Sequence, residues 1–265
     1  MLETYQARTK GIVFSFEDLA DGATIQLSET LNEDVYILGL SGARYTNRAS
    51  ALGVEPLLLR LFFPDEQSMF NVRLPWEACV GTAENMMPFK APPVWKARQE
   101  LFVELVNNQG YTEEWGDLIV WVVEKDAVKA SDRPLRTPWQ TRTQLQGVVV
   151  DEFGPTATVQ RGITFNRAGY IWAVQGAKWS QNASFLDTMR VWYGFQQNAA
   201  IVSDYAAFTA VVGSGLFPRW FKAPLPVTEH QTIQVSFQNT NTTYAIGACV
   251  VFHFVPTEAM PGMVP

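Results

Sequence analysis

The chain alternates apolar and polar residues over many short stretches, which is the pattern of β-strands with one buried face. A clear case is the stretch in which Leu101, Val103 and Leu105 occupy alternate positions. Gly or Pro ends several of these stretches, as expected for turns between strands. The pattern predicts strands at residues 35–40, 57–63, 70–74, 101–106, 118–123, 170–174, 189–195, 233–237 and 250–255.

Helical signals are scarce. Residues 203–212 predict a helix of two or three turns, with Ser203 as its N-cap and Gly213 as its C-cap. Residues 1–10 are expected to form a short helix or an arm. Neither segment changes the class, so we expect an all-β protein.

The most informative feature is an internal duplication. Residues 23–50 align without a gap on residues 157–184, and 11 of these 28 pairs are identical. A second block aligns with a slightly smaller offset, and it contains the identical segment Phe-Lys-Ala-Pro at residues 89–92 and 221–224. Convergent strand composition explains the alternation but not this four-residue identity, so the pattern indicates two copies of one domain.

Two copies of about 100 residues with seven or eight strands each predict tandem jelly-roll-like β-sandwiches. An immunoglobulin-like sandwich is the alternative, but its Cys-Trp-Cys spacing is missing, because the only cysteines are Cys79 and Cys249. The expected division is an N-terminal arm at 1–22, copy one at 23–124, a basic linker at 125–150, copy two at 151–255 and a C-terminal tail at 256–265.

Charge divides unevenly between these segments. The whole chain has a net charge of −6, which argues against specific recognition of nucleic acid. Copy one holds 14 acidic and 7 basic residues, copy two holds 5 and 6, and the linker holds 2 and 5. Opposite charges suit contacts in which each copy meets the unlike copy of a neighbouring chain, although drift after duplication is an equal alternative.

No catalytic or metal-binding constellation is found. The two histidines are His230 and His253, and His253 follows Cys249 by four positions. On a strand that spacing separates the two side chains by about 13 Å, too far to share a metal. Neither a nucleophile elbow nor a phosphate-binding loop is present. We therefore expect no catalytic residue, no cofactor and no metal, and no enzyme activity.

Targeting signals are also missing. The N-terminal residues have no charged start followed by an apolar run, and no stretch approaches 18 apolar residues. With only two cysteines, this favours folding in a reducing cytoplasm and no membrane insertion.

Exposed tryptophans and the basic linker are the candidate contact residues. Trp76, Trp95 and Trp220 fall near predicted strand ends, where aromatic side chains often contact partners. Linker arginines could contact an acidic neighbour or packaged nucleic acid, although a solvated linker is the simpler interpretation. The expected interface residues are Trp76, Trp95, Trp220, Arg133, Arg136 and Arg142.

Two sandwiches in tandem, without an enzyme motif or signal, resemble the double jelly-roll major capsid proteins of viruses. The resemblance rests on the duplication and strand pattern of residues 23–255. It implies a homo-oligomer in which three chains form a capsomer of six sandwiches. The Phe-Lys-Ala-Pro segment before an alternating strand also resembles β-sandwich collar, neck or decoration proteins of tailed phages.

The sequence thus predicts a phage virion protein that folds in the host cytoplasm and self-assembles into the capsid shell with other virion proteins. A trimer is favoured, and a larger ring is possible. The alternatives are a collar, neck or decoration protein and a carbohydrate-binding β-sandwich module. A sugar module would be a monomer with a cluster of exposed tryptophans on one surface.

Overall fold

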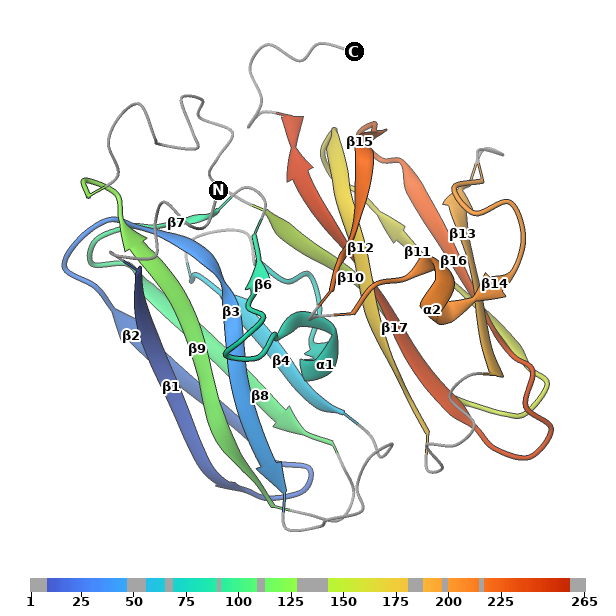
Figure 1. Cartoon of the computed structure of the whole chain (residues 1–265), viewed down its shortest axis with the longest axis horizontal. Coiled ribbons are helices and arrows are strands. Elements are labelled where there is room, and N and C mark those ends of the chain that lie inside the picture. The colour runs from blue at the N-terminus through green and yellow to red at the C-terminus, as the bar shows by residue number, and fades with distance from the viewer. Residues whose placement is uncertain are drawn as a thin grey trace.

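The computed structural model shows two β-sandwiches side by side, and it describes residues 9–46, 56–64, 69–89, 92–108, 113–127, 143–180, 188–196, 200–214 and 217–257. Copy one occupies one end of the long axis and copy two the other (Figure 1). Within these ranges the regular elements are strands, apart from two helices of four residues each.

Copy one consists of two facing antiparallel sheets. The first has the order β1-β9-β3-β6, with β7 also paired to β3, and the second has the order β2-β8-β4-β5. The short helix α1 follows β5 directly. The elements are β1 Thr9–Leu19, β2 Thr24–Thr30, β3 Val35–Thr46, β4 Leu57–Phe62, β5 Leu74–Pro75, α1 Trp76–Cys79, β6 Met87–Pro88, β7 Val94–Trp95, β8 Glu100–Asn107 and β9 Glu114–Glu124.

Copy two repeats this plan. Its sheets have the orders β10-β17-β12-β15 and β11-β16-β13-β14, and helix α2 again follows the last strand of the second sheet. The elements are β10 Gln144–Phe153, β11 Thr158–Thr164, β12 Gly169–Trp179, β13 Met189–Phe195, β14 Ala206–Ala207, α2 Phe208–Val211, β15 Arg219–Val227, β16 Thr232–Asn239 and β17 Ile246–Pro256.

The two sheet orders correspond strand for strand, which confirms an all-β fold of two tandem jelly-roll sandwiches built from a duplication. The correspondence extends to individual contacts. A Cβ on Gly42 would lie 2.6 Å from the ring of Trp76, and a Cβ on Gly176 would lie 3.0 Å from the ring of Phe208. Each copy therefore requires glycine at the point where its helix aromatic crosses the sheet.

Each sandwich encloses its own apolar core. Strand β8 shows why, because its residues alternate strictly between buried and half-buried positions. Leu101, Val103 and Leu105 point inward from it and are fully buried, and the counterparts Ile233, Val235 and Phe237 on β16 are fully buried in copy two. The alternation in the sequence thus corresponds to the buried faces of the sheets.

Two expected segment boundaries differ from the structure. The segment expected as an arm, residues 1–22, contains β1, which pairs with β9 along most of its length. The segment expected as a linker, residues 125–150, contains most of β10, which pairs with β17. The sequence pattern does not reveal either strand, because charged residues interrupt the alternation in β1 and the continuous run Gly-Val-Val-Val at residues 147–150 interrupts it in β10. Strand β1 supplies an edge of the five-stranded sheet of copy one, and β10 supplies an edge of a four-stranded sheet of copy two.

Two predicted elements are also shorter than expected. Within residues 203–212 the helix comprises only Phe208–Val211, its N-cap is Ala207 and its C-cap is Val212, so neither Ser203 nor Gly213 caps it. Of the strand expected at residues 70–74, only Leu74 lies in β5. The expected helix or arm at residues 1–10 lies mostly outside the described residues.

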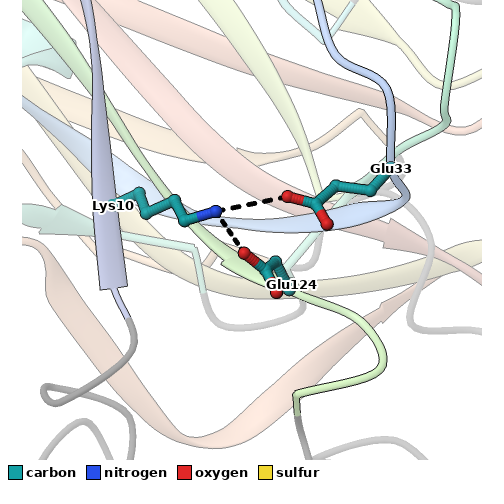
Figure 2. A network of polar contacts seen from close by, with 3 residues as sticks. All are labelled: Lys10, Glu33 and Glu124. Carbon is teal, nitrogen blue, oxygen red and sulfur yellow. Dashed lines mark hydrogen bonds and ion pairs between the residues drawn. The ribbon is translucent and has the colours of Figure 1, made fainter.

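A charged cluster closes the end of copy one where β1 begins and β9 ends. The Lys10 ammonium group donates to Glu33 at 3.2 Å and to Glu124 (Figure 2). These hydrogen bonds raise the pKa of Lys10, the one to Glu124 having the larger effect. The cluster holds the edge strand β1 to the turn before β3. Because all three side chains are solvated, it contributes little to stability.

Candidate interaction surfaces

The two copies are joined through one segment of copy one. Residues 69–80, which include β5 and α1, lie against the outer face of the β10-β17-β12 sheet of copy two (Figure 1). The apolar core of copy one continues into that face and takes up Leu145, Trp179, Cys249 and Val251. The junction is therefore a continuation of a hydrophobic core and not a flexible link.

Hydrogen bonds fix the register of this junction. Leu145 donates its backbone N–H to Met69 at 2.7 Å, and Asn71 donates to Leu145 at 3.2 Å. The side chain of Asn71 also bridges to Gly147, accepting from its N–H at 2.7 Å and donating to its carbonyl at 3.3 Å. Edge strand β10 of copy two is thus partly covered by backbone from copy one, which removes an open sheet edge.

A buried polar relay crosses the middle of the junction. The Gln175 side-chain amide on β12 donates to the carbonyl oxygen of Ala78 in α1 at 2.6 Å. Its oxygen lies 2.8 Å from Nε2 of His253 on β17. All three residues are fully buried, and burial lowers the pKa of His253 to about 3. The relay therefore involves a neutral histidine, and it uses a helix carbonyl that would otherwise be orphaned.

Both cysteines lie in the same junction. Cys79 of α1 and Cys249 of β17 are buried as free thiols, close enough for the two groups to interact electrostatically. Burial raises the pKa of both thiols, that of Cys249 to about 12. Buried thiols of this kind behave as small apolar groups and not as nucleophiles.

The corresponding face of copy one is open. On β17 the outward positions Cys249, Val251 and His253 are fully buried, so that this strand is covered on both sides. On β9 the equivalent outward positions are only half-buried. We define the open sheet face as the outward residues of β1, β9 and β3, which the strand registers place side by side: Val13, Ser15, Ala43, Tyr45, Asp117 and Ile119.

The segment of copy two that corresponds to residues 69–80 of copy one is more exposed. We define the α2 segment as residues 201–212 together with Phe217. Ala78 and Pro75 are buried in the junction, whereas their counterparts Ala210 and Ala207 are exposed. Phe217 is 66% exposed. Copy one therefore has an uncovered sheet face, and copy two has an uncovered segment of the kind that covers such a face.

A buried carboxylate also lies outside the junction. Glu114 at the start of β9 is fully buried, and its carboxylate lies 3.9 Å from Arg44, which also pairs with Glu77 of α1. Burial raises the pKa of Glu114, and the Arg44 charge only partly offsets this effect. Among the described residues, no group of three or more His, Cys, Asp or Glu side chains could hold a metal ion.

A polar hollow lies where the copies meet. Residues from both copies line it, including Asn71 of copy one and two arginines of copy two, and no carboxylate borders it. It has no tryptophan in its wall, and Trp220 is the exposed tryptophan among the described residues. The aromatic cluster expected of a sugar-binding module is therefore not found in the described part of the chain.

The expected interface residues fall into three groups. Trp76 and Trp95 are buried inside copy one, where Trp76 packs edge-on to Phe16 at 6.2 Å and Trp95 donates to the carbonyl of Gln99 at 2.8 Å. Both are core residues, because the chain around each short element folds back over the ring. Trp220 on β15 is 38% exposed and lies edge-on to His253. Arg133, Arg136 and Arg142 lie outside the described residues.

The junction residues were missed at the level of sequence, although a signal for them exists. Strand β17 is apolar at almost every position, whereas its counterpart β9 carries Asp117 among its outward residues. A strand that is apolar at almost every position is buried on both faces of its sheet, whereas a strand with polar outward residues is buried on one. A comparison of outward positions between the copies would have located the junction on copy two.

Sequence comparison identifies no relative: no family model and no curated protein matches this chain. Structure comparison does. The chain is similar to the crystal structure of the STIV MCP, with a TM-score of 0.50 and 10% identity over 97% of this chain and 99% of that chain. It also aligns with a chain in the atomic structure of Sulfolobus Turreted Icosahedral Virus, with a TM-score of 0.44, 8% identity, and coverage of 94% and 90%.

A third match is the CUB1-EGF-CUB2 domain of human MASP-1/3, with a TM-score of 0.23, 8% identity, and coverage of 92% and 99%. The alignment with the STIV MCP extends over both sandwiches and shows that the two chains share a tandem jelly-roll fold.

Proposed function

We propose that this chain is a virion structural protein that builds a capsid shell through its two jelly rolls. The single observation that carries the proposal is the end-to-end alignment of both sandwiches with the STIV MCP, which leaves almost no residue of either chain unmatched. A fold alone does not define a function. The surfaces described above supply the second support. Copy one leaves the open sheet face exposed and copy two leaves the α2 segment exposed, whereas the counterparts of these two surfaces cover each other in the internal junction.

The proposal includes self-assembly. Three chains with two sandwiches each would close a ring of six, and other virion proteins would contact that ring. The source would be a phage, and the chain would fold in the host cytoplasm before assembly. No helix of the described residues is long and apolar enough to cross a membrane. The proposed role is structural and uses no enzyme activity.

Electron microscopy of the concentrated, purified chain tests this function. The proposal predicts flat arrays or closed shells whose repeating unit contains six sandwiches. Isolated rings that never extend into arrays would instead support a collar or neck protein. Dispersed single chains that bind oligosaccharides on a glycan array would overturn the shell protein and support a sugar-binding module.

A further inference from the structure

We propose that the α2 segment of one chain docks on the open sheet face of a second copy of this chain. The contact would repeat between chains the packing that joins the two copies within one chain. This inference rests on the proposed function, because it names the partner and the surfaces through which a shell protein would assemble. It adds which residues meet and how the contact differs from the internal junction.

The internal junction provides the template. In it, residues 69–80 of copy one cover the outer face of β10, β17 and β12. Strand registers assign each covered residue a counterpart in copy one: Val13 takes the place of Gly147, Ile119 that of Val251, and Tyr45 that of Trp179. A face built from the corresponding strands is thus available, with larger side chains at the positions of Gly147 and Val251 and a tyrosine at the position of Trp179.

Exposure singles out the two surfaces. Five large hydrophobic side chains of the described residues are markedly exposed. Two of them, Val13 and Tyr45, lie on the open sheet face at 55% exposure each, and Phe217 lies on the α2 segment at 66%. Three of the five thus lie on these two surfaces, where contact with a partner would bury them.

The two surfaces belong to different sandwiches of the molecule. Strands β1, β9 and β3 belong to the sandwich at one end of the long axis, α2 and β14 belong to the other sandwich, and α1 lies between the sandwiches (Figure 1). One chain therefore cannot satisfy both of its own surfaces. A head-to-tail contact between different surfaces closes a ring or extends an array.

Charge is complementary at the centre of the proposed contact. Asp117 takes the place of Cys249, the residue that faces Cys79 in the internal junction. The counterpart of Cys79 is Val211, and the carbonyl oxygen next to it, on Ala210, accepts from Arg219 at 2.6 Å. Docking in the template geometry therefore brings the Asp117 carboxylate beside the Arg219 guanidinium group.

The proposed contact differs from the internal junction in its hydrogen bonds. The internal junction needs Gln175 to reach the carbonyl of Ala78, so that separating the copies would leave a buried pair unmade. In the proposed contact Ser41 replaces Gln175, and it already accepts from Trp121 Nε1 at 2.7 Å. The Ala210 carbonyl is likewise satisfied within its own chain by Arg219. Both of these polar groups are therefore hydrogen-bonded when the chains are separate, which suits a reversible association of folded chains.

Charge reversal tests the contact by native mass spectrometry and light scattering. Asp117→Arg and Arg219→Glu should each weaken association at least tenfold, because each places like charges together. The double variant should restore it, because every face then meets an α2 segment of opposite charge. Phe217→Glu should also shift the population toward the single chain of 29.7 kDa.

The matched control is Arg60→Glu, a charge reversal on β4 in the other sheet of copy one, where Arg60 lies over the ring of Phe62. It should leave the native mass unchanged. A wild-type oligomer that tolerates Asp117→Arg, Arg219→Glu and Phe217→Glu would overturn the proposed contact and leave the virion function standing. A wild-type chain that stays single at every concentration would overturn the assembly on which the inference rests.

Discussion

The amide of Gln175 on β12 donates to the carbonyl oxygen of Ala78 in α1 at 2.6 Å, and this bond ties the two sandwiches of the chain together. Both residues are fully buried. Because no water reaches the pair, losing one partner leaves a desolvated carbonyl and not a solvated one. The bond therefore stabilises the junction together with the apolar core that the two copies share.

Gln175→Ala should lower the free energy of unfolding by about 1–3 kcal/mol, the usual cost of an unsatisfied buried polar group. The substitution also frees Nε2 of His253, which adds to the cost. Urea denaturation followed by tryptophan fluorescence measures the change. Gln26→Ala at an exposed position of β2 is the control. Equal midpoints for the two variants would show that the relay does not hold the junction.

His253 should make stability fall in mild acid. Its pKa is lowered to about 3 by burial, whereas in the unfolded chain it is near 6.5. The unfolded state therefore binds a proton between these values and the folded state does not. The stabilisation is complete above pH 6.5 and is lost as pH falls, at up to about 1.4 kcal/mol per pH unit.

Unfolding curves between pH 7 and pH 5 isolate this effect, because carboxyl groups titrate mainly at lower pH. His253→Gln should flatten the dependence. His230→Gln changes the other histidine, which is largely exposed, and should leave the dependence as in the wild type. An unchanged slope in the His253 variant would contradict a buried neutral histidine.

Glu114 should destabilise the folded chain once it is ionised. Burial raises its pKa above the ordinary value, so the folded state holds the proton more tightly than the unfolded state. The favourable contribution is present below about pH 4.5 and is lost as pH rises through the folded-state pKa. Glu114→Gln should therefore raise stability at pH 7 relative to the wild type and make little difference near pH 4. A variant that is less stable at pH 7 would show that the Arg44 pair dominates.

Trp76→Ala should cost about 3–5 kcal/mol, because it empties a core site beside Phe16 and Gly42. Trp220→Ala, at a partly exposed ring, should cost much less. Thermal unfolding of both variants gives the comparison. Similar losses at the two positions would contradict the assignment of Trp76 to the core.

The thiols of Cys79 and Cys249 should be inert toward a disulfide reagent at pH 8 in the native chain. Burial raises the pKa of both, so the reactive thiolate is scarce and inaccessible. Both should react at once in denaturant. The absorbance of the thiolate that the reagent releases gives the number of thiols that have reacted. Rapid reaction of the native chain would mean that the junction opens readily.

The sequence predicts the sandwiches well because the same strand pattern occurs twice, once in each copy. Leu105 and Phe237, or Asn107 and Asn239, recur at one spacing, and alternation then identifies their buried faces. It fails where burial depends on the neighbouring copy. Val251, which copy one covers, and the half-buried Ile119 are both apolar and β-branched, so only a comparison of their outward neighbours between the two copies distinguishes them. The pattern places Trp76 and Trp95 near strand ends, but the chain around each short element folds back over the ring, a tertiary effect that periodicity does not record.

Strand β1 illustrates a second limit. Lys10 and Glu17 interrupt its apolar pattern, yet β9 pairs with it through backbone hydrogen bonds that do not depend on side chains. Edge strands of this kind tolerate charge because one edge faces solvent. Their existence follows from the sheet they complete and not from their own composition.

The native mass of the purified chain, measured by light scattering at two concentrations tenfold apart, tests the central claim most directly. A shell protein built from two jelly rolls predicts a mass that is a multiple of 29.7 kDa, with three chains as the smallest stable species and larger assemblies at the higher concentration. A mass of 29.7 kDa at both concentrations would contradict a self-assembling virion protein.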